Sequence, residues 1–348
     1  MSGPRLMLLP CEPGTGHGYA IAVAADLARL QPGPGDVVLV RADRPVPPGE
    51  RFRAFGTPAR WEQVGNLLRG RPSSEISEAR IRGALAGLEG PFDEIFAGEI
   101  FFYRALRRMF PEALIRVRTH NLFSLVRCRQ WAGRLPTQAR HALNMWQYSR
   151  LEREILADRK VELVFITEEE AAFARLLWPS LRGAWWPVVD PGLAPAADIR
   201  PPTAPRVVHF GSTAAAHTAI GVKRLCRQVW PRVRAALPEA ELHLFGHGSE
   251  RFDDRARGIH GHGRHPGAGL PLAGGALFCV PDIHGMGIKL KVADLLKAGV
   301  PFITTPLGLS GYRLPPHPHI LVRDLDDWAE AIPAYFRAQG LIPSRDQR

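Results

Sequence analysis

The stretch HGMGIKLKVADLLKAGVP combines glycines, lysines and an acidic residue at the start of a predicted helix. Gly285 and Gly287 stand just before that helix, and glycine lets a backbone approach a ligand closely. A helix N-terminus offers free backbone N–H groups and the positive end of the helix dipole, which suits phosphate. Lys289 and Lys291 add positive charge, and Asp294 can accept hydrogen bonds from ribose hydroxyls. The pattern predicts a site for a nucleoside diphosphate; the alternative is a solvated helix with i,i+3 ion pairs.

The same stretch has the spacing of a helix with one face in a core. Ile288, Val292, Leu295 and Leu296 recur at helical intervals, and Gly299 is placed where a left-handed residue ends a helix. The predicted helix therefore begins after the glycine loop and ends at Gly299.

A histidine ends one of the predicted strands in the first half of the chain. His120 closes LIRVRTH, at the edge where an α/β fold places its ligands. A neutral imidazole there can bond to a hydroxyl or a phosphate. The alternative is a strand-end histidine that caps the following helix.

The loop PGTGHG follows the first predicted strand and contains Gly14, Gly16 and His17. It departs from the dinucleotide pattern G-x-G-x-x-G because Tyr19 occupies the last position, although Asp43 lies roughly where a ribose-binding acid would be. A histidine in such a loop can act as a general base. The alternative is a loop residue with no chemical role.

A second histidine group, IHGHGRH, contains His260, His262 and His265. Their spacing could hold a metal on a hairpin, but no cysteine or carboxylate is close in sequence. We therefore predict that the protein has no metal site.

The elements that must position these residues alternate between strands and helices. The strands are predicted at 5–10, 36–42, 92–98, 114–120 and 161–167, and a helix at 18–30. Thr167 and Glu170 form a capping box at the start of a further helix. Alternation of this kind predicts the α/β class with parallel sheets.

A proline-rich stretch divides the chain. Residues 191–205 contain five prolines and have no periodicity, and a strand–helix pattern then restarts. We predict a first Rossmann-like domain over 1–190, a hinge over 191–205, and a second Rossmann-like domain over 206–325. The cleft between two such domains is the natural site.

Composition limits the class of protein. The chain has 348 residues, 45% of them hydrophobic and 23% charged, which is typical of a soluble protein with two cores. Its apolar runs are too short for a membrane span or a signal-peptide core, so we expect a cytoplasmic protein. Four scattered cysteines without a CxxC motif predict free thiols.

Positive charge is concentrated in one segment. Residues 101–160 contain thirteen Lys and Arg against four Asp and Glu, within a chain of net charge +11. Aromatic side chains such as Trp131 and Trp146 are interleaved with the arginines. The segment predicts a peripheral contact with anionic lipid or a lipid-linked acceptor, rather than nucleic acid; the alternative is a solvated arginine-rich face.

The motifs together resemble a known family. GMGIKLKVADLLKAGVPFITTPLGLSGY is similar to the nucleotide-sugar-binding segment of GT-B glycosyltransferases, in particular the retaining group called family 4. VVHFGSTAAAHTAIGVKRLCRQVW resembles the start of the same domain, and RTHNLFSL resembles the R-x-H-N motif of the first domain. The likeness covers most of residues 114–312. It implies two Rossmann-like domains that face each other across a cleft, with the donor on the second, and a C-terminal helix at 326–348 that returns to the first.

The resemblance also implies roles for particular residues. The donor diphosphate would be bound by two glycine turns and the lysines of the helix (Gly211, Ser212, Gly285, Gly287, Lys289 and Lys291). Asp294 would bind the ribose and His120 the transferred sugar. The loop with Gly14, Gly16 and His17 resembles the acceptor loop of inverting relatives, in which the histidine is the base. The longer likeness at the C-terminus favours retention.

The resemblance therefore predicts a glycosyltransferase in glycan, polysaccharide or glycolipid synthesis. Its partners would be a nucleotide sugar and a glycan or lipid-linked acceptor, without a cofactor. Two positions differ from the family pattern: Asp294 replaces a glutamate, and His284 stands where many relatives have one. These differences support the alternative of a non-catalytic glycan-binding or scaffold protein. A dinucleotide oxidoreductase using PGTGHG is the third possibility.

Overall fold

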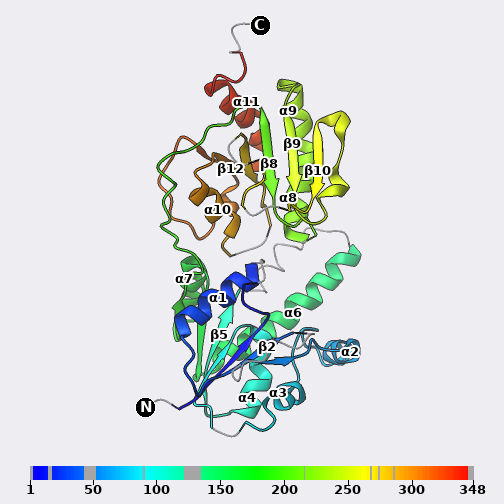
Figure 1. The fold of residues 1–348 in the computed structure, drawn as a ribbon. Helices are drawn as coiled ribbons and strands as arrows, with labels where there is room; N and C mark the ends of the chain where they lie inside the picture. The colour runs from blue at the N-terminus through cyan, green and yellow to red at the C-terminus, as the bar shows by residue number, and fades with distance from the viewer. Residues whose placement is uncertain are drawn as a thin grey trace. The chain divides into compact units, whose positions relative to one another are not determined.

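The computed structural model describes residues 3–14, 18–42, 52–88, 91–120, 135–214, 216–266, 269–272, 275–284 and 287–343. The chain forms two compact units, Met1–Val188 and Val189–Arg348. Each unit contains its own sheet with helices on both faces (Figure 1). The chain is thus α/β, as the alternating pattern predicted.

The first unit is built on a seven-stranded sheet whose strands are all parallel. The strands are β1 (Arg5–Leu9), β2 (Val37–Arg41), β3 (Phe52–Phe55), β4 (Glu94–Ala97), β5 (Leu114–Thr119), β6 (Val161–Phe165) and β7 (Gly183–Trp185). The helices are α1 (Gly18–Leu30), α2 (Arg60–Leu68), α3 (Glu78–Leu85), α4 (Tyr103–Met109), α6 (Leu135–Ala157) and α7 (Glu168–Leu177). The strand order is β3-β2-β1-β4-β5-β6-β7.

The second unit repeats this plan with six parallel strands. They are β8 (Arg206–Phe210), β9 (Glu241–Phe245), β10 (Ile259–Gly263), β11 (Leu277–Val280), β12 (Phe302–Thr304) and β13 (Ile320–Val322). The helices are α8 (Ala216–Arg224), which continues through a π-helical turn into α9 (Trp230–Ala236), α10 (Leu290–Ala298) and α11 (Trp328–Ala338). The strand order is β10-β9-β8-β11-β12-β13.

Both orders correspond to the Rossmann order, in which the direction of strand succession reverses in the middle of the sheet. The reversal lies between β1 and β4 in the first unit and between β8 and β11 in the second. Ligands of such sheets bind beyond the carboxyl ends of the strands at this point. The loops after these four strands are therefore where a site is expected.

Each sheet is buried on both faces, which explains why its strands read as continuous apolar runs. Neighbouring residues of β1, such as Leu6 and Met7, belong to cores on opposite faces. In the second unit Val207 packs with α8, α9 and α11, and Val208 packs with α10. Period-two alternation between two cores fixes the register of every central strand.

Most predicted elements are confirmed. The helix predicted at 18–30 is α1, and the strands predicted before residue 170 are β1, β2, β4, β5 and β6. Thr167 caps α7 by accepting a hydrogen bond from the Glu170 N–H. α10 ends at Gly299, which has a positive φ of 60°. The strands that the sequence did not reveal are β3, β7 and β10, which lie at the edges of the two sheets.

The proline-rich segment and the last helix, α11, both pack within the second unit. The proline-rich segment lies along the second unit, because Ala196 N donates to Leu296 O and Arg200 N donates to Gly299 O. α11 buries Trp328 and Phe336 completely in the core of the second unit, against α9 (Figure 1). α11 is therefore part of the core of the second unit, and whether the helix predicted at 326–348 also returns to the first domain stays a prediction.

Candidate functional site

A pocket of about 440 Å³ lies at the carboxyl edge of the first sheet. Its lining comes from the loops after β1 and β4, the end of β2, the first turn of α1, and α6. The lining residues are Pro10, Cys11, Tyr19, Arg41, Ser74, Glu99, Phe101 and Tyr148. The pocket is therefore at the switch point, where the fold predicts a ligand.

Glu99 is the buried acid of this pocket. Arg41 Nη1 donates to its Oε2 at 3.2 Å, and the Tyr19 hydroxyl also donates to it. Burial raises the pKa of the Glu99 carboxyl, and the charge of Arg41 opposes that rise. Arg41 is itself fixed by donating to Pro10 O at 3.1 Å. A buried acid with an arginine partner can accept a hydrogen bond from a ligand hydroxyl.

His120 lies beside this pocket, directly after β5. Its ring is 4.2 Å from that of Tyr19, and its Nε2 donates to Gly98 O at 3.0 Å. Because a carbonyl only accepts, the proton is on Nε2 and Nδ1 is an acceptor. Burial, together with the charge of Arg118, lowers the pKa of His120 to about 3. The imidazole is therefore neutral near pH 7 and can accept a hydrogen bond from a hydroxyl at Nδ1.

Gly98 makes this arrangement possible. A Cβ atom there would lie 2.7 Å from Pro10 Cδ and 2.9 Å from Leu8 O. Only glycine allows the turn after β4 to pass so close to β1, and its carbonyl then orients His120.

Part of the predicted acceptor loop lies outside the described residues, namely Gly16 and His17. Gly14 has a φ of 78°, and a Cβ atom there would have no neighbour within 4 Å. Asp43, considered as a ribose-binding acid, also lies outside the described residues. Glu99 and Arg41 were missed because they are 58 positions apart in the chain and meet only through the strand order.

The second unit presents a polar centre at the corresponding edge of its own sheet. Lys291, near the start of α10, lies 3.0 Å through its Nζ from Asp282 Oδ2 in the loop after β11. A Cβ atom on Gly211, after β8, would be only 3.7 Å from the Lys291 ammonium. Gly211 has a φ of 127°, so the ammonium faces a bare backbone turn.

Asp282 is almost completely buried. Burial opposes its ionisation, but the charges of Lys291 and Lys289 hold its pKa below the usual range. Its Oδ1 has no hydrogen-bond partner within the described part of the chain. His209 lies nearby, donates from Nδ1 to Cys279 O at 3.2 Å, and leaves Nε2 without a partner there. Two buried acceptors next to an ammonium form a centre that can take hydrogen-bond donors.

The remaining predicted residues occupy different positions. Lys289 is buried, and its Nζ donates to Gly287 O at 2.9 Å, so it closes the glycine loop on itself. Gly287 has a φ of 72°, which explains the need for glycine there. Ser212 is exposed next to Gly211, and Asp294 is exposed on α10. Gly285 lies outside the described residues.

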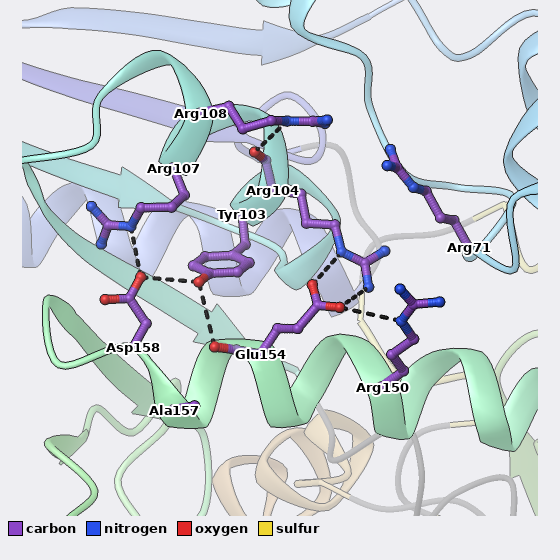
Figure 2. Close-up of a pocket in the computed structure, with 9 residues that line it drawn as sticks. All are labelled: Arg71, Tyr103, Arg104, Arg107, Arg108, Arg150, Glu154, Ala157 and Asp158. Carbon is purple, nitrogen blue, oxygen red and sulfur yellow. Dashed lines mark hydrogen bonds and ion pairs between the residues drawn. The ribbon is translucent and has the colours of Figure 1, made fainter.

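Another pocket, of about 550 Å³, lies away from these loops, and its lining is drawn in Figure 2. It is lined by Arg71, Tyr103, Arg104, Arg107, Arg108, Arg150, Glu154, Ala157 and Asp158. α4 leads into β5 and the end of α6 leads into β6, so the pocket is at the amino ends of the strands. Figure 2 shows Arg104 and Arg150 turned toward Glu154, and Arg107 turned toward Asp158, with Arg107 Nε 2.6 Å from Asp158 Oδ2. This pocket is an ion-pair network and not the site that the fold predicts.

The ion pairs also bear on the predicted basic surface. Among the described residues of 101–160, seven cations pair with carboxylates: Arg104, Arg107, Arg108, Arg116, Arg118, Arg150 and Lys160. Several of these acids, such as Asp26 and Glu75, come from outside the segment. Residues 121–134, with three further arginines, lie outside the described chain. Of the helices in the described part, none is long and apolar enough to cross a membrane.

Comparisons with known structures show that the chain has a GT-B fold. The chain is similar to WaaG, a glycosyltransferase involved in lipopolysaccharide biosynthesis, with a TM-score of 0.53 and 14% identity over 97% of this chain and 96% of that one. It is similar to a trehalose-6-phosphate synthase described as transferring with retention, with a TM-score of 0.58 and 11% identity over 97% of this chain and 91% of that one. It is also similar to Anabaena HepE in complex with UDP, with a TM-score of 0.55 and 12% identity over 97% of this chain and 90% of that one.

The sequence itself matches a family over much of its second half. Residues 204–337 match the family described as glycosyl transferases group 1. This range contains Gly211, Asp282 and Lys291, the residues that the structure brings together. A comparison with curated protein sequences gives no match. The resemblance to GT-B glycosyltransferases inferred from the motifs is thus confirmed.

Proposed function

We propose that the protein transfers a sugar from a nucleoside diphosphate to a hydroxyl acceptor, with the donor bound by the second unit. The observation that carries this proposal is the ammonium of Lys291 above the positive-φ turn at Gly211, at the carboxyl edge of a Rossmann-like sheet. An ammonium, exposed backbone and the N-terminus of α10 together form an anion site.

The diphosphate is the group that this centre suits best. Lys291 has three N–H donors, so it can bond to a phosphate oxygen while it keeps Asp282 as a partner. Positive charge at this point stabilises the negative charge that develops on the leaving diphosphate. Lys289 contributes by holding the Gly287 loop closed, and Asp294 binds the ribose from the exposed side of α10.

Retention is the stereochemical outcome we favour. The trehalose-6-phosphate synthase that shares the fold is described as transferring with retention. In a retaining transfer the leaving phosphate can take the acceptor's proton, so no histidine base is needed. His120 is neutral and accepts at Nδ1, which suits a hydrogen bond from a sugar hydroxyl and not proton abstraction. Glu99 and Arg41 would bind acceptor hydroxyls in the pocket of the first unit.

A lipid-linked acceptor is supported by α2. This helix has no buried residue, and Trp61, Val64 and Leu68 form an exposed apolar stripe, with Trp61 75% and Leu68 85% accessible. Arg60 and Arg69 are exposed at its two ends. An apolar stripe flanked by arginines is typical of a helix that lies in an anionic lipid surface. We propose that α2 is such a contact.

Calorimetric titration tests the donor site. UDP and uridine serve as probes, after a thermal-shift panel of nucleoside diphosphates. The double variant Asp282→Asn/Lys291→Met removes the ammonium without leaving a bare buried carboxylate. This variant should weaken the binding of UDP by roughly 1.5–3 kcal/mol, the contribution of a charge-assisted hydrogen bond, and should leave the binding of uridine unchanged.

Two further variants complete that experiment. Asp294→Ala should weaken both ligands similarly, because it removes a ribose contact. Lys297→Met, an exposed lysine of the same helix, is the matched control and should change neither affinity. Equal affinities in all folded variants would refute the donor site. Donor binding without transfer or hydrolysis of any nucleotide sugar would instead identify a non-catalytic glycan-binding protein.

A further inference from the structure

Four side chains that can bind metals lie on one face of two neighbouring strands, at the edge of the second sheet. Glu241 and His243 are two residues apart in β9 and therefore point to the same face. His260 of β10 is in register with His243, and His262 follows on the same face. The sequence grouped the β10 histidines with His265 on a hairpin. Parallel pairing instead brings them to the histidine and the glutamate of β9.

Three of these side chains converge. His243 Nε2 lies 3.2 Å from Glu241 Oε2, and His260 Nε2 lies 3.8 Å from Glu241 Oε1. The three ligand atoms are all within 4.8 Å of one another. Ligands of a tetrahedral metal with bonds of about 2.0–2.1 Å are roughly 3.4 Å apart. The backbone therefore holds the three side chains close enough for a rotation of the rings to reach this spacing.

We propose that Glu241, His243 and His260 bind a divalent transition metal of the zinc class, with water completing the coordination. Two imidazoles and one carboxylate are ligands that suit Zn²⁺ and Co²⁺ more than Mg²⁺ or Ca²⁺. The rings of His243 and His260 are stacked 4.6 Å apart at 10°. A metal lies in the plane of each imidazole it binds, so both rings turn about χ2 toward the carboxylate. The site is independent of sugar transfer and ties the edge strand to its neighbour.

His262 orients the central ligand. His243 Nδ1 lies 3.0 Å from His262 Nε2. When Nε2 of His243 binds the metal, Nδ1 carries the proton and donates it to His262, which fixes the tautomer.

Arg255 competes with the metal. Its Nη1 donates to His260 Nδ1 at 2.6 Å, which places the proton of a neutral ring on Nε2, the metal-binding atom. Metal binding requires the other tautomer and displacement of Arg255, which is 62% exposed and also pairs with Asp253 at 3.0 Å. Arg206, 3.4 Å from Glu241, is a second cation at the site. Removal of Arg255 should therefore tighten the site.

Titration of the metal-free full-length chain with Co²⁺ tests the proposal. Co²⁺ bound by nitrogen and oxygen ligands gives visible ligand-field bands, and Zn²⁺ should displace it. One equivalent should bind. His243→Ala and His260→Ala should lose the bands and bind more than ~10-fold more weakly, and His262→Ala should cost roughly 10–100-fold as the loss of an orienting partner.

Two further variants make the test specific. Arg255→Ala should bind Co²⁺ more tightly than the wild type, whereas His317→Ala, which removes an imidazole elsewhere in the unit, should bind it equally. Zn²⁺ should raise the unfolding temperature of the wild type but not of His260→Ala, because only the native site binds it. The proposal is overturned if the wild type gives no bands, or if His243→Ala and His260→Ala keep them. If one variant fails to fold, the other carries the test.

Discussion

Replacement of Lys291 by methionine should destabilise the second unit more than its place on a helix surface suggests. Lys291 is only 16% exposed, and its ammonium is the 3.0 Å partner of Asp282, which is 2% exposed. The substitution leaves a buried carboxylate without its nearest counter-ion. Removal of one partner of a buried pair costs about 3–5 kcal/mol. Because Lys289 also lowers the pKa of Asp282 and remains in place, we expect the free energy of unfolding to fall by about 3 kcal/mol.

The loss of stability in Lys291→Met should depend on pH, because it depends on whether Asp282 is ionised. In the wild type the folded-state pKa of Asp282 is lowered, so the pair contributes stability above the unfolded value of about 3.9 and loses it as the pH falls. In Lys291→Met burial dominates and raises that pKa, so ionisation of Asp282 opposes folding as the pH rises. The variant should thus be closer to the wild type at about pH 5 than at about pH 7.5.

Urea unfolding followed by circular dichroism at both pH values measures the effect. Asp282→Asn/Lys291→Met should recover much of the loss, because a neutral amide replaces the bare charge. Lys297→Met, an exposed lysine of α10, should stay within about 0.5 kcal/mol of the wild type. The reasoning is wrong if Lys291→Met is as stable as Lys297→Met near neutral pH.

Four further predictions concern the first unit. His120→Ala should reduce turnover far more than His17→Ala, with the product anomer retained; the reverse order with an inverted anomer would make His17 the base. With the pKa of His120 at about 3, turnover should show no titration of this residue between about pH 5 and 8. Because burial raises the pKa of Glu99, ionisation of this carboxyl lowers the stability of the fold as the pH rises. Glu99→Gln should remove this pH dependence, measured as the unfolding temperature at several pH values. The same variant should weaken acceptor binding, measured as a higher KM for the acceptor. The double variant Trp61→Ser/Leu68→Ser should bind anionic vesicles more weakly than the wild type, and wild-type binding should weaken as the salt concentration rises. If vesicle binding changes with neither the substitutions nor the salt concentration, α2 is not the lipid contact.

Much of the fold could be predicted from the sequence because it depends on local patterns. The strands buried on both faces appear as apolar runs, and the helices between them show a 3.6-residue period. Gly299 as the end of α10 and Thr167 as the start of α7 follow from backbone geometry that only a few residues satisfy. The edge strands β3, β7 and β10 were missed because they are only partly buried, so they have no continuous apolar run.

Part of the site was also within reach of the sequence. A parallel sheet places its ligand loops at the carboxyl ends of the strands, and this locates His120, Gly211 and the start of α10 without any coordinates. The spacing of the glycines and lysines around residue 290 indicated an anion site, and the match of residues 204–337 agrees with that assignment.

What only the tertiary structure decided is which side chains are partners. Lys291 reads as a solvated lysine of a helix until the loop after β11 brings Asp282 to 3.0 Å. Glu99 and Arg41 meet across the carboxyl edge of the first sheet, and Glu241 joins the histidines of β10 because β9 is their parallel neighbour. Local sequence fixes the shape of each element through sterics and hydrophobic period. Ion pairs and ligand sets depend instead on strand order and register, which are set by the packing of whole layers.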